Sequence, residues 1–591
     1  MPNTDQNPRG PSIRQLEIQN FRAIRYFKWH PALGMNVVTG PGDIGKSTIL
    51  SAVALLLSPA PTLTITEFDF YKRATGQNII IEAVLSLNDL HELSEDGFPT
   101  PPLRGWKDNT LRDLPDEDGA EPVIYCRLRV NKDFETEHCI VGAGDQIAAF
   151  RRSLRQRIGL MRLGLADRYD RDLRLVQGGA LDQFIGSRDL RDTILQTIFK
   201  TSIHDALDPD VQTKLEEVDA KFSEESLPSP VRLGLVGTPG VSMAASVGLM
   251  VGDSNEQALP ITSWGSGTQK FASLAMASLV SEDHAIALID EPESGLEPYR
   301  QRSFIKRLQR EGKRQSFIIT HSPAVLETAT NLGGTVWRLR ELIPPTRPPA
   351  EEVTAPESSH NCINLSENEQ LKNVLQKNPE AVLAKLPIVC EGKTELGFAE
   401  VILEDHFGPD YRTRGIHPFE VGGGNVAALK VCQKFIAAEI PFTCVADDEG
   451  THTGSWQAVI EKSPCLRWDN QKCTEEVVFG LVPDDRLLEI LDWADSINYR
   501  ERRHLIPEIK KALGENVMQP ECEWLRTFGR DVLLAAITKV AVPPGSNREK
   551  GWFKSVSGGR FLAGKMLEIG PAAALRQKLD RFFASVRQAT E

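Results

Sequence analysis

Residues 285–298 read AIALIDEPESGLEP, and this stretch decides how the rest of the chain is interpreted. Its first five residues are small or branched apolar residues, which is typical of a strand buried on both faces of a parallel sheet. Asp290 and Glu291 follow, and Pro292 ends the run. Open α/β sheets bind ligands at the carboxyl edge, so the stretch predicts an α/β fold with two carboxylates at a binding edge. The alternative is an ordinary strand followed by a solvated acidic turn.

A phosphate-binding motif lies near the N-terminus. Residues 34–39 (GMNVVT) predict a strand, residues 40–48 (GPGDIGKST) follow the pattern G-x-x-x-x-G-K-[ST], and residues 49–57 predict an apolar helix. Backbone N–H groups of such a loop close on phosphate oxygens, Lys46 would reach the β- and γ-phosphates, and the Ser47 hydroxyl would ligate Mg²⁺. The predicted nucleotide-binding residues of this loop are Gly40, Gly42, Gly45, Lys46, Ser47 and Thr48.

The bulk composition indicates a globular protein of several domains. Its net charge of -13 predicts no long-range attraction to nucleic acid, so a nucleic-acid site would need a local patch or metal ions. The nine cysteines include no C-x-x-C pair, which favours reduced thiols in a cytoplasm over a disulfide framework. No segment approaches the roughly 20 apolar residues that cross a bilayer, so we expect a cytoplasmic protein without a membrane partner.

Residues 149–225 have a helical pattern and predict a helical dimerisation module inserted in the α/β domain. A dense group of arginines runs through its first part and could contact DNA phosphates. A solvated helix face with intrahelical pairs to aspartates is the favoured alternative. The arginines are Arg151, Arg152, Arg155, Arg157, Arg162, Arg168, Arg171 and Arg174.

Three further motifs follow the phosphate-binding loop in a fixed order. They are GSGTQ at residues 265–269, DEPESGL at residues 290–296 and FIITHS at residues 317–322. This order resembles the ABC-type ATPase head, in which a nucleotide lies between two heads. The resemblance implies positioning and charge neutralisation at the phosphates. The implied roles are γ-phosphate binding in trans for Ser266 and Gly267, Mg²⁺ support for Asp290, polarisation of the attacking water for Glu291 and γ-phosphate contact for His321.

The GSGTQ motif differs from the transporter form LSGGQ, with Gly265 in place of Leu and Thr268 in place of the second Gly. No transmembrane partner is found in the chain. Both features favour the branch with SMC-like and DNA-repair ATPases over transporters.

The C-terminal half predicts a second parallel sheet. Strands are expected at residues 386–390, 419–421 and 442–446, with helices between them. Glu391 and Glu395 follow the first strand, and Asp447, Asp448 and Glu449 follow the third. Carboxylates that converge at one sheet edge repel one another unless cations bind, and hard oxygen ligands suit Mg²⁺ or Mn²⁺. Two acidic turns that never meet are the alternative.

These acidic elements resemble the Toprim fold of topoisomerases, primases and nucleases. There an early Glu takes part in acid/base or metal chemistry, which matches Glu391 and Glu395, and a D-x-D pair binds metal. The second element is imperfect here. Asp447 and Glu449 are the preferred pair because alternate residues at a strand end face the same side, and Asp448 remains possible.

An ABC-type head followed by a Toprim domain resembles the OLD (overcoming lysogenization defect) family of ATP-dependent nucleases. The resemblance implies further acidic metal ligands and a lysine that stabilises charge on the phosphate. Glu475 and Glu476 are the candidate acids, and Lys554 is the candidate lysine. The rival lysines are Lys550 and Lys565.

The sequence therefore predicts an ATP-regulated DNA endonuclease that uses ATP and Mg²⁺, with Mn²⁺ or Ca²⁺ as alternatives at the Toprim site. We expect a homodimer or higher even oligomer, a role in anti-phage defence or DNA processing, and possible helicase or reverse-transcriptase partners encoded nearby. The alternatives are a DNA-repair or SMC-like ATPase that binds DNA or a partner without cutting, and a regulated scaffold. The expected parts are an ATPase at 1–148 and 226–342, the insert at 149–225, a linker at 343–384 and a nuclease domain at 385–591.

Overall fold

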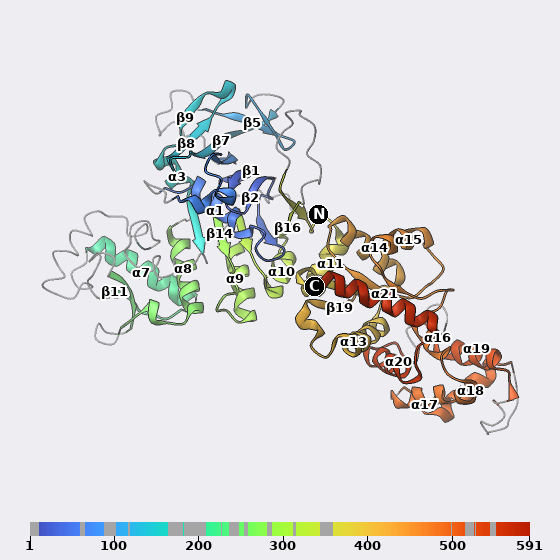
Figure 1. Ribbon diagram of the computed structural model, residues 1–591. Coiled ribbons are helices and arrows are strands. Elements are labelled where there is room, and N and C mark those ends of the chain that lie inside the picture. The colour runs from blue at the N-terminus through green and yellow to red at the C-terminus, as the bar shows by residue number, and fades with distance from the viewer. Residues whose placement is uncertain are drawn as a thin grey trace. The chain divides into compact units, whose positions relative to one another are not determined.

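The structure is a computed structural model of the 591-residue chain. It divides into two compact units, Met1–Ser366 and Glu367–Glu591 (Figure 1). Within the part of the chain that it describes, no helix combines the length and apolar character needed to cross a membrane. The described residues are 11–59, 65–87, 102–115, 119–163, 181, 208–225, 227–235, 247–252, 258–280, 286–310, 315–342, 358–497, 499–514, 525, 527–543 and 551–590.

The core of the first unit is a six-stranded sheet in the order β10-β14-β15-β3-β16-β17. The neighbouring strands run parallel except for β17, which pairs with β16 in antiparallel register. The apolar side chains of β14 are buried, which confirms the predicted buried strand, and Asp290 ends it. The strands are β10 (Leu160–Leu163), β14 (Ile286–Asp290), β15 (Ser316–Ile319), β3 (Met35–Thr39), β16 (Thr335–Glu341) and β17 (His360–Asn364).

An antiparallel eight-stranded sheet forms a second layer of this unit. Helix α1 (Lys46–Leu56) lies between the two sheets, because its Ile49 and Val53 share a buried cluster with Ile81 of one sheet and Leu288 of the other. The strands are β1 (Ser12–Phe21), β2 (Ile24–Trp29), β4 (Ile79–Ser86), β5 (Arg104–Lys107), β6 (Thr110–Arg112), β7 (Glu121–Val130), β8 (Thr136–Val141) and β9 (Ile147–Ala149).

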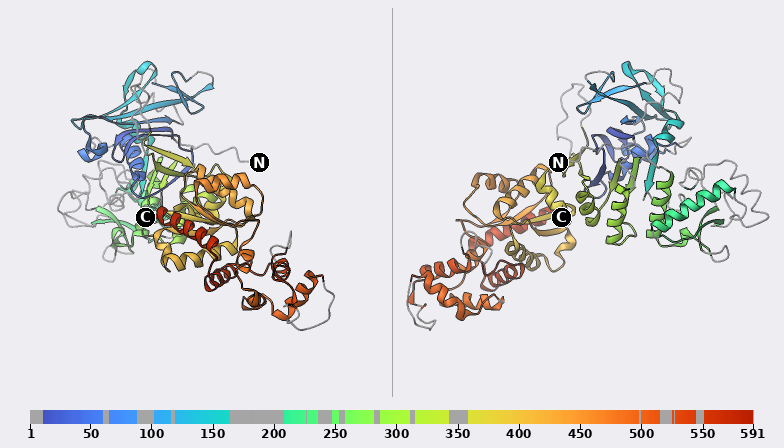
Figure 2. Two further views of the ribbon diagram at one scale, coloured as in Figure 1. Left: turned by 45° about the vertical axis from the view of Figure 1, so that its right-hand side comes forward. Right: turned by 180° about the vertical axis from the view of Figure 1, so that it is seen from behind.

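The predicted helical insert at 149–225 is only partly helical in its described residues. α3 (Arg152–Ile158) and α7 (Pro209–Glu224) are helices, but β10 joins the parallel sheet beside β14. α7 packs on a small antiparallel sheet, β11 (Val231–Leu235), β12 (Val247–Val251) and β13 (Leu259–Pro260), as Figure 2 shows. Residues 190–203, which belong to the predicted insert, lie outside the described residues.

Two arginines of the basic segment donate hydrogen bonds to backbone carbonyls at the C-terminal end of α1. Arg155 is buried and donates to the carbonyl of Ser58 at 2.7 Å, and Arg162 donates to the carbonyl of Ala54. Cations at a helix C-terminus satisfy its last carbonyls and its dipole. Neither a DNA contact nor a solvated helix face describes these two residues. Arg168, Arg171 and Arg174 lie outside the described part of the chain.

The segment predicted as a linker at 343–384 contains ordered elements. β17 belongs to the first unit, whereas α11 (Glu369–Lys377) and α12 (Pro379–Leu383) belong to the second. The Asn368 side chain accepts from the Gln370 N–H and caps α11. Residues 343–357 lie outside the described ranges. The boundary between the units falls between Ser366 and Glu367.

The second unit contains a parallel sheet in the order β19-β18-β20-β21. Three strands are present near the predicted positions, although β19 spans Ile416–Glu420 instead of residues 419–421, and the short β21 was missed. The chain order reverses between β18 and β20, which is the switch point where such sheets bind ligands. The strands are β18 (Leu386–Cys390), β19 (Ile416–Glu420), β20 (Thr443–Ala446) and β21 (Leu466–Arg467).

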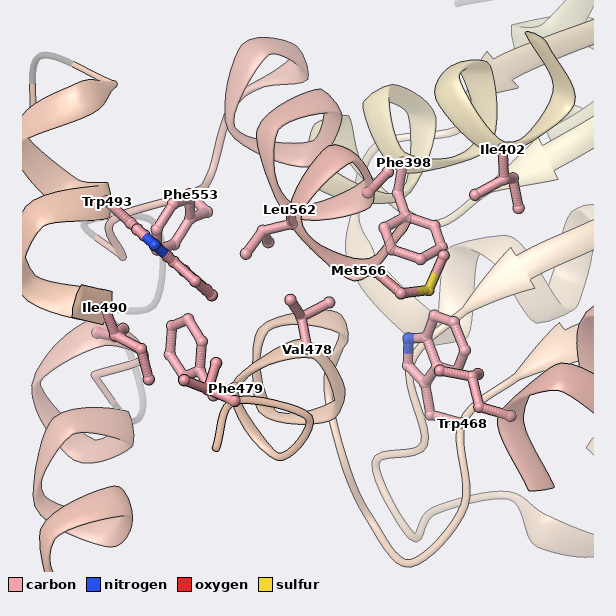
Figure 3. Close-up of a cluster of buried hydrophobic side chains, with 14 of the residues drawn as sticks. Phe398, Ile402, Trp468, Val478, Phe479, Ile490, Trp493, Phe553, Leu562 and Met566 are labelled. Atoms are coloured by element: carbon pink, nitrogen blue, oxygen red, sulfur yellow. The ribbon is translucent and has the colours of Figure 1, made fainter. Parts of the chain in front are cut away.

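Helices complete the second unit. Phe398 of α13, Val478 of α16 and Leu562 of α20 belong to one buried cluster, which joins the sheet layer to the C-terminal helices (Figure 3). The helices are α13 (Lys393–Phe407), α14 (Gly424–Ala437), α15 (Thr453–Lys462), α16 (Thr474–Phe479), α17 (Glu489–Ser496), α18 (Arg502–Ala512), α19 (Arg530–Ala541), α20 (Val556–Ile569) and α21 (Ala573–Thr590).

Candidate functional site

The predicted phosphate-binding loop joins β3 to α1. Gly45 has φ 89° and precedes α1, and a Cβ at Gly40 would lie 2.6 Å from the carbonyl oxygen of Leu339. Both positions therefore need glycine. Lys46 is buried, and its ammonium donates to the carbonyls of Gly40, at 3.1 Å, and of Pro41. In this structure the lysine folds back on its own loop.

Asp290 lies beside the loop at the end of β14. Burial raises the pKa of its carboxyl, and a hydrogen bond from the Ser47 hydroxyl opposes the rise. Burial lowers the pKa of Lys46, against the attraction of Asp43, Asp290 and Glu291. Oδ1 of Asp290 is buried and has no hydrogen-bond partner among the residues described. A hydroxyl and an unsatisfied carboxylate oxygen fit a hard cation such as Mg²⁺.

The turn after β14 is strained and closely held. Glu291 has φ 47°, and its N–H donates to the carbonyl of Ile319 at 2.9 Å. Glu293, to which the sequence analysis assigned no role, accepts from the Thr320 hydroxyl at 2.8 Å and from the His321 N–H at 2.6 Å. The second Glu of the DEPE motif therefore fixes the backbone of the segment that carries His321.

The GSGTQ motif begins helix α8 (Ser266–Val280) and contacts the same turn. A Cβ at Gly295 would lie 2.2 Å from Oγ of Ser266, and a Cβ at Gly267 would lie 3.0 Å from the Gly295 carbonyl oxygen. Lys270 is buried and donates to the carbonyl of Glu291 at 3.2 Å; burial lowers its pKa. The motif residues and the acidic turn therefore form one packed assembly.

Glu391 and Asp447 meet at the carboxyl edge of the second sheet. They follow β18 and β20, which are paired neighbours. Oε2 of Glu391 accepts from the Asp447 N–H at 3.1 Å and from Nδ2 of Asn425 at 2.9 Å. Asn425 also donates to the Asp447 carbonyl at 2.8 Å and accepts from Nε1 of Trp456 at 2.7 Å. The two acidic turns therefore lie together, held by an asparagine that the sequence analysis did not select.

Thr474 ties Asp447 to Glu395. Its hydroxyl oxygen lies 3.0 Å from Oε1 of Glu395 and 3.1 Å from Oδ1 of Asp447, and its N–H donates to the latter at 2.9 Å. Nε1 of Trp468 donates to the same hydroxyl at 2.8 Å, which leaves the hydroxyl proton for the carboxylates. The sequence did not indicate Thr474 either, because only its contacts in the folded chain show that it lies between Glu395 and Asp447.

Lys554 and Glu475 complete this group, which we call the carboxylate centre: Glu391, Glu395, Asp447, Glu475 and Lys554. Nζ of Lys554 lies 2.7 Å from Oε1 of Glu475, whose side chain is fully buried. Oε2 of Glu475 has no hydrogen-bond partner in the described part of the chain. Burial lowers the pKa of Lys554, but Glu475, Glu395 and Asp447 outweigh it and raise the pKa.

The carboxylate centre carries more negative charge than its lysine balances. Burial and the charge of Asp447 raise the pKa of Glu391 to about 7. Burial also raises the pKa of Glu395 to about 7, although Lys554 opposes the rise. Burial and the charges of Glu395 and Glu475 raise the pKa of Asp447 well above its usual range. Protons or cations are therefore required at neutral pH.

Several predicted residues lie outside this group. Asp448 is paired with Arg467 at 2.6 Å, and its pKa is lowered because the N–H groups of Gln471 and Gly450 and the Arg467 charge outweigh burial. Glu476 caps α16 by accepting from the Cys473 N–H. The structure thus gives both residues other partners than the predicted metal.

The remaining candidates are placed as follows. Glu449 is near enough for its charge to raise the pKa of Glu391. Lys565 pairs with Glu568 at 2.6 Å, and Lys550 lies outside the described residues. Of the two candidate lysines that the structure describes, Lys554 lies among the carboxylates and Lys565 does not.

The carboxylate centre fits a divalent metal in the chemistry of its donor atoms but not in their present arrangement. Among the residues that the structure describes, no group of three or more His, Cys, Asp or Glu side chains is already arranged around a metal position. Lys554 lies against Glu475 instead. The donor set nevertheless consists of hard oxygens, one of them buried without a hydrogen-bond partner, and this chemistry fits Mg²⁺ or Mn²⁺.

Comparisons with known proteins bear on the first unit. Residues 126–327, about a third of the chain, match the family described as "AAA domain, putative AbiEii toxin, Type IV TA system". The matched region includes Ser266, Asp290, Glu291 and His321. No curated protein matches the chain.

Three solved structures are similar to parts of the chain. An Smc head bound to the C-winged helix domain of ScpA is 16% identical, with 61% of this chain and 99% of that chain covered and a TM-score of 0.37. An Smc head domain with an extended coiled coil, bound to the C-terminal domain of ScpA from Pyrococcus furiosus, is 14% identical, with 60% of this chain and 97% of that chain covered and a TM-score of 0.35. The SMC head domain from Thermotoga maritima is 13% identical, with 56% of this chain and 95% of that chain covered and a TM-score of 0.28.

The phosphate-binding loop, the acidic turn of Asp290 and Glu291, and the family match support the same conclusion. The first unit is an α/β ATP-binding ATPase, and its residues 126–327 are similar to the AAA domain family.

Proposed function

We propose that the chain is an ATP-regulated, divalent-metal-dependent DNA endonuclease, with its cutting site at the carboxylate centre. The observation that carries this proposal is the convergence of five ionisable side chains from four separate segments of the second unit. Buried like charges cost stability, and strongly perturbed pKa values cluster at functional sites. This arrangement supports the Toprim and OLD resemblance of the sequence.

Glu391, Glu395, Asp447 and Glu475 are the residues that would hold Mg²⁺ or Mn²⁺, with Glu449 beside them. Two such ions would supply charge stabilisation for the attacking and leaving oxygens of a phosphodiester. Asn425 and Thr474 orient the carboxylates through the hydrogen bonds described above. Lys554 contributes a fixed positive charge that would neutralise charge on the phosphate.

The loop after β19 offers an approach for the nucleic acid backbone. Gly422, Gly423 and Gly424 all have positive φ, and a Cβ at Gly422 or Gly424 would meet nothing within 4 Å. The loop leads into the N-terminus of α14 at the same sheet edge as Glu391. Backbone N–H groups at a helix start are suited to phosphate oxygens.

The ATPase unit would control access to the cutting site. Lys46 and Ser47 would bind phosphates and Mg²⁺ with Asp290, Glu291 would polarise water, and His321 would contact the γ-phosphate. In a homodimer, Ser266 and Gly267 of one subunit would complete the site of the other. A role in phage defence, with a helicase or reverse-transcriptase partner, rests on the OLD resemblance alone.

A plasmid assay tests this function. Purified protein is incubated with supercoiled DNA, with Mg²⁺ or Mn²⁺ and with or without ATP. We expect metal-dependent nicking that is lost in Glu391→Ala and Asp447→Ala and retained in Glu404→Ala, an exposed position on α13. The proposal would be refuted if both site variants still nick DNA, or if the wild type nicks DNA with neither Mg²⁺ nor Mn²⁺.

Two observations favour a second candidate, an ATPase that binds DNA without cutting it. No preformed metal group exists among the described residues, and the Lys554–Glu475 pair could be a permanent structural ion pair. This candidate predicts DNA binding without nicking under every metal condition, and unchanged DNA affinity in Asp447→Ala.

A further inference from the structure

Helices α13 and α20 cross with their backbones in direct contact. A Cβ at Gly397 on α13 would lie 2.0 Å from the carbonyl oxygen of Val556, and a Cβ at Gly559 on α20 would lie 2.0 Å from the carbonyl oxygen of Thr394. Real Cβ atoms essentially never approach other atoms closer than 3.0 Å. A side chain at either glycine would therefore separate the helices by about 1 Å or more, because packed interiors leave no spare volume.

This crossing lies next to the carboxylate centre on both helices. Thr394 and Glu395 are in the first turn of α13, and Lys554 is two residues before α20 begins. The Thr394 hydroxyl donates to the carbonyl of Phe553 at 2.9 Å. The peptide that leads into Lys554 is therefore tied to the turn that carries Glu395.

We propose that Gly397, Gly559 and Thr394 are positioning residues that place the Lys554 ammonium against Glu475. The catalytic meaning of this placement rests on the proposed function, but the placement itself can be measured without DNA cleavage. None of the three touches the carboxylate centre's reacting groups with its own side chain; they act by setting the distance between two helices.

The distances show why small movements matter. Nζ of Lys554 and Oε1 of Glu475 lie 2.7 Å apart, and the attraction between the two charges weakens as this distance grows. A retreat of α20 from α13 by about 1 Å would carry the lysine away from the Glu395 side of the centre and would change its position relative to Glu475. Misplacement on this scale costs about a hundredfold in rate where positioning matters.

The first test measures the lysine in metal-free protein. Acylation of each lysine by an amine-reactive ester is followed by mass spectrometry, with exposed Lys430 as the internal reference. Gly559→Ala should raise Lys554 labelling about fivefold or more, because its local protection is lost. The matched control is Gly564→Ala on the same helix, where a Cβ meets nothing within 4 Å, and it should leave Lys554 labelling unchanged.

A folded Gly559→Ala protein with wild-type labelling of Lys554, or an equal rise in Gly564→Ala, would overturn the proposal. If Gly559→Ala does not fold, Thr394→Val decides, since it removes the hydrogen bond to Phe553 and keeps the shape of the side chain. It should raise Lys554 labelling about twofold or more, while Thr394→Ser behaves like the wild type. Unchanged labelling in Thr394→Val would contradict the proposal.

A double-mutant cycle separates positioning from general damage. If Gly559 acts through the lysine, Gly559→Ala should slow nicking in the wild type but have no further effect in Lys554→Ala. Equal effects in both backgrounds would mean that the glycine supports structure alone, which overturns the proposal. If the wild type does not nick DNA, the proposed function fails, and the labelling experiment still decides the placement of Lys554.

Discussion

Replacing Glu391 by glutamine should stabilise the metal-free protein, and increasingly so as the pH rises. The pKa of Glu391 is raised from an ordinary value of 4.5 to about 7, chiefly by burial and by Asp447. The folded state therefore holds a proton that the unfolded state has released, and stability falls as the pH rises from about 4.5 to about 7. Glutamine is neutral at every pH and can keep an oxygen that accepts from Asn425 and Asp447.

The size of the effect follows from the shift. A shift of about 2.5 units corresponds to roughly 3 kcal/mol at pH 8, since one unit corresponds to about 1.4 kcal/mol. At pH 5.5 the Glu391 carboxyl is still mostly protonated in the folded protein, but it is mostly ionised in the unfolded chain. The pH is then about one unit above the unfolded pKa of 4.5, so glutamine stabilises the folded protein by about 1.4 kcal/mol relative to the wild type. The advantage of Glu391→Gln should therefore grow by about 2 kcal/mol between these two pH values.

Hydrogen exchange of β18 in the presence of a chelator measures this difference, because it reports the opening of the second unit separately from the first. Glu404→Gln, an exposed position on α13, is the matched control and should change nothing at either pH. A Glu391→Gln protein that is no more stable than the wild type at pH 8 would refute the reasoning, since Glu391 would then carry its charge without cost.

Three further results are expected. Lys46→Ala should lower ATP turnover by about a hundredfold or more, measured by phosphate release, because the loop loses its phosphate-binding charge; turnover near the wild-type rate would contradict the assignment of the loop. Glu293→Gln should lower kcat for ATP about tenfold with little change in ATP affinity, because Thr320 and His321 together lose one of the two carboxylate oxygens that accept their hydrogen bonds; an equal loss of affinity would argue for general damage. Thr474→Val should weaken Mn²⁺ binding and nicking about 10- to 100-fold, as for groups that orient metal ligands, whereas Thr474→Ser should retain both; a fully active Thr474→Val would remove the hydroxyl from the account.

Local patterns in the sequence were sufficient for the strands that carry the two predicted sites and for the residues that follow those strands, but not for β10, β17 or β21. The apolar run before Asp290 predicted a buried strand because strand periodicity and burial are local properties. The sequence predicted that Glu391 and Asp447 lie close together, because the carboxyl ends of parallel strands meet at one sheet edge. In the structure the two residues directly follow the paired strands β18 and β20. The strand alternation that preferred Glu449 over Asp448 agrees with the Arg467 pairing of Asp448, although the metal role of Glu449 stays a prediction.

The rest depends on contacts between distant residues. Glu475 and Glu476 are adjacent in sequence, and only the cap at Cys473 and the pair with Lys554 distinguish them. Arg155 and Arg162 satisfy the end of α1, about a hundred residues earlier in the chain. A charge pattern along the sequence does not contain this information, because capping partners are chosen by the fold.

The central claim is that the carboxylate centre binds divalent cations. Titration of the nucleotide-free protein with Mn²⁺ in a calorimeter measures this directly, since the phosphate-binding loop alone offers few ligands without a nucleotide. We predict binding by the wild type that is lost in Asp447→Asn and retained in the exposed variant Glu404→Gln. A wild type that binds no Mn²⁺ at millimolar concentration, or an Asp447→Asn protein that binds it equally well, would contradict the claim.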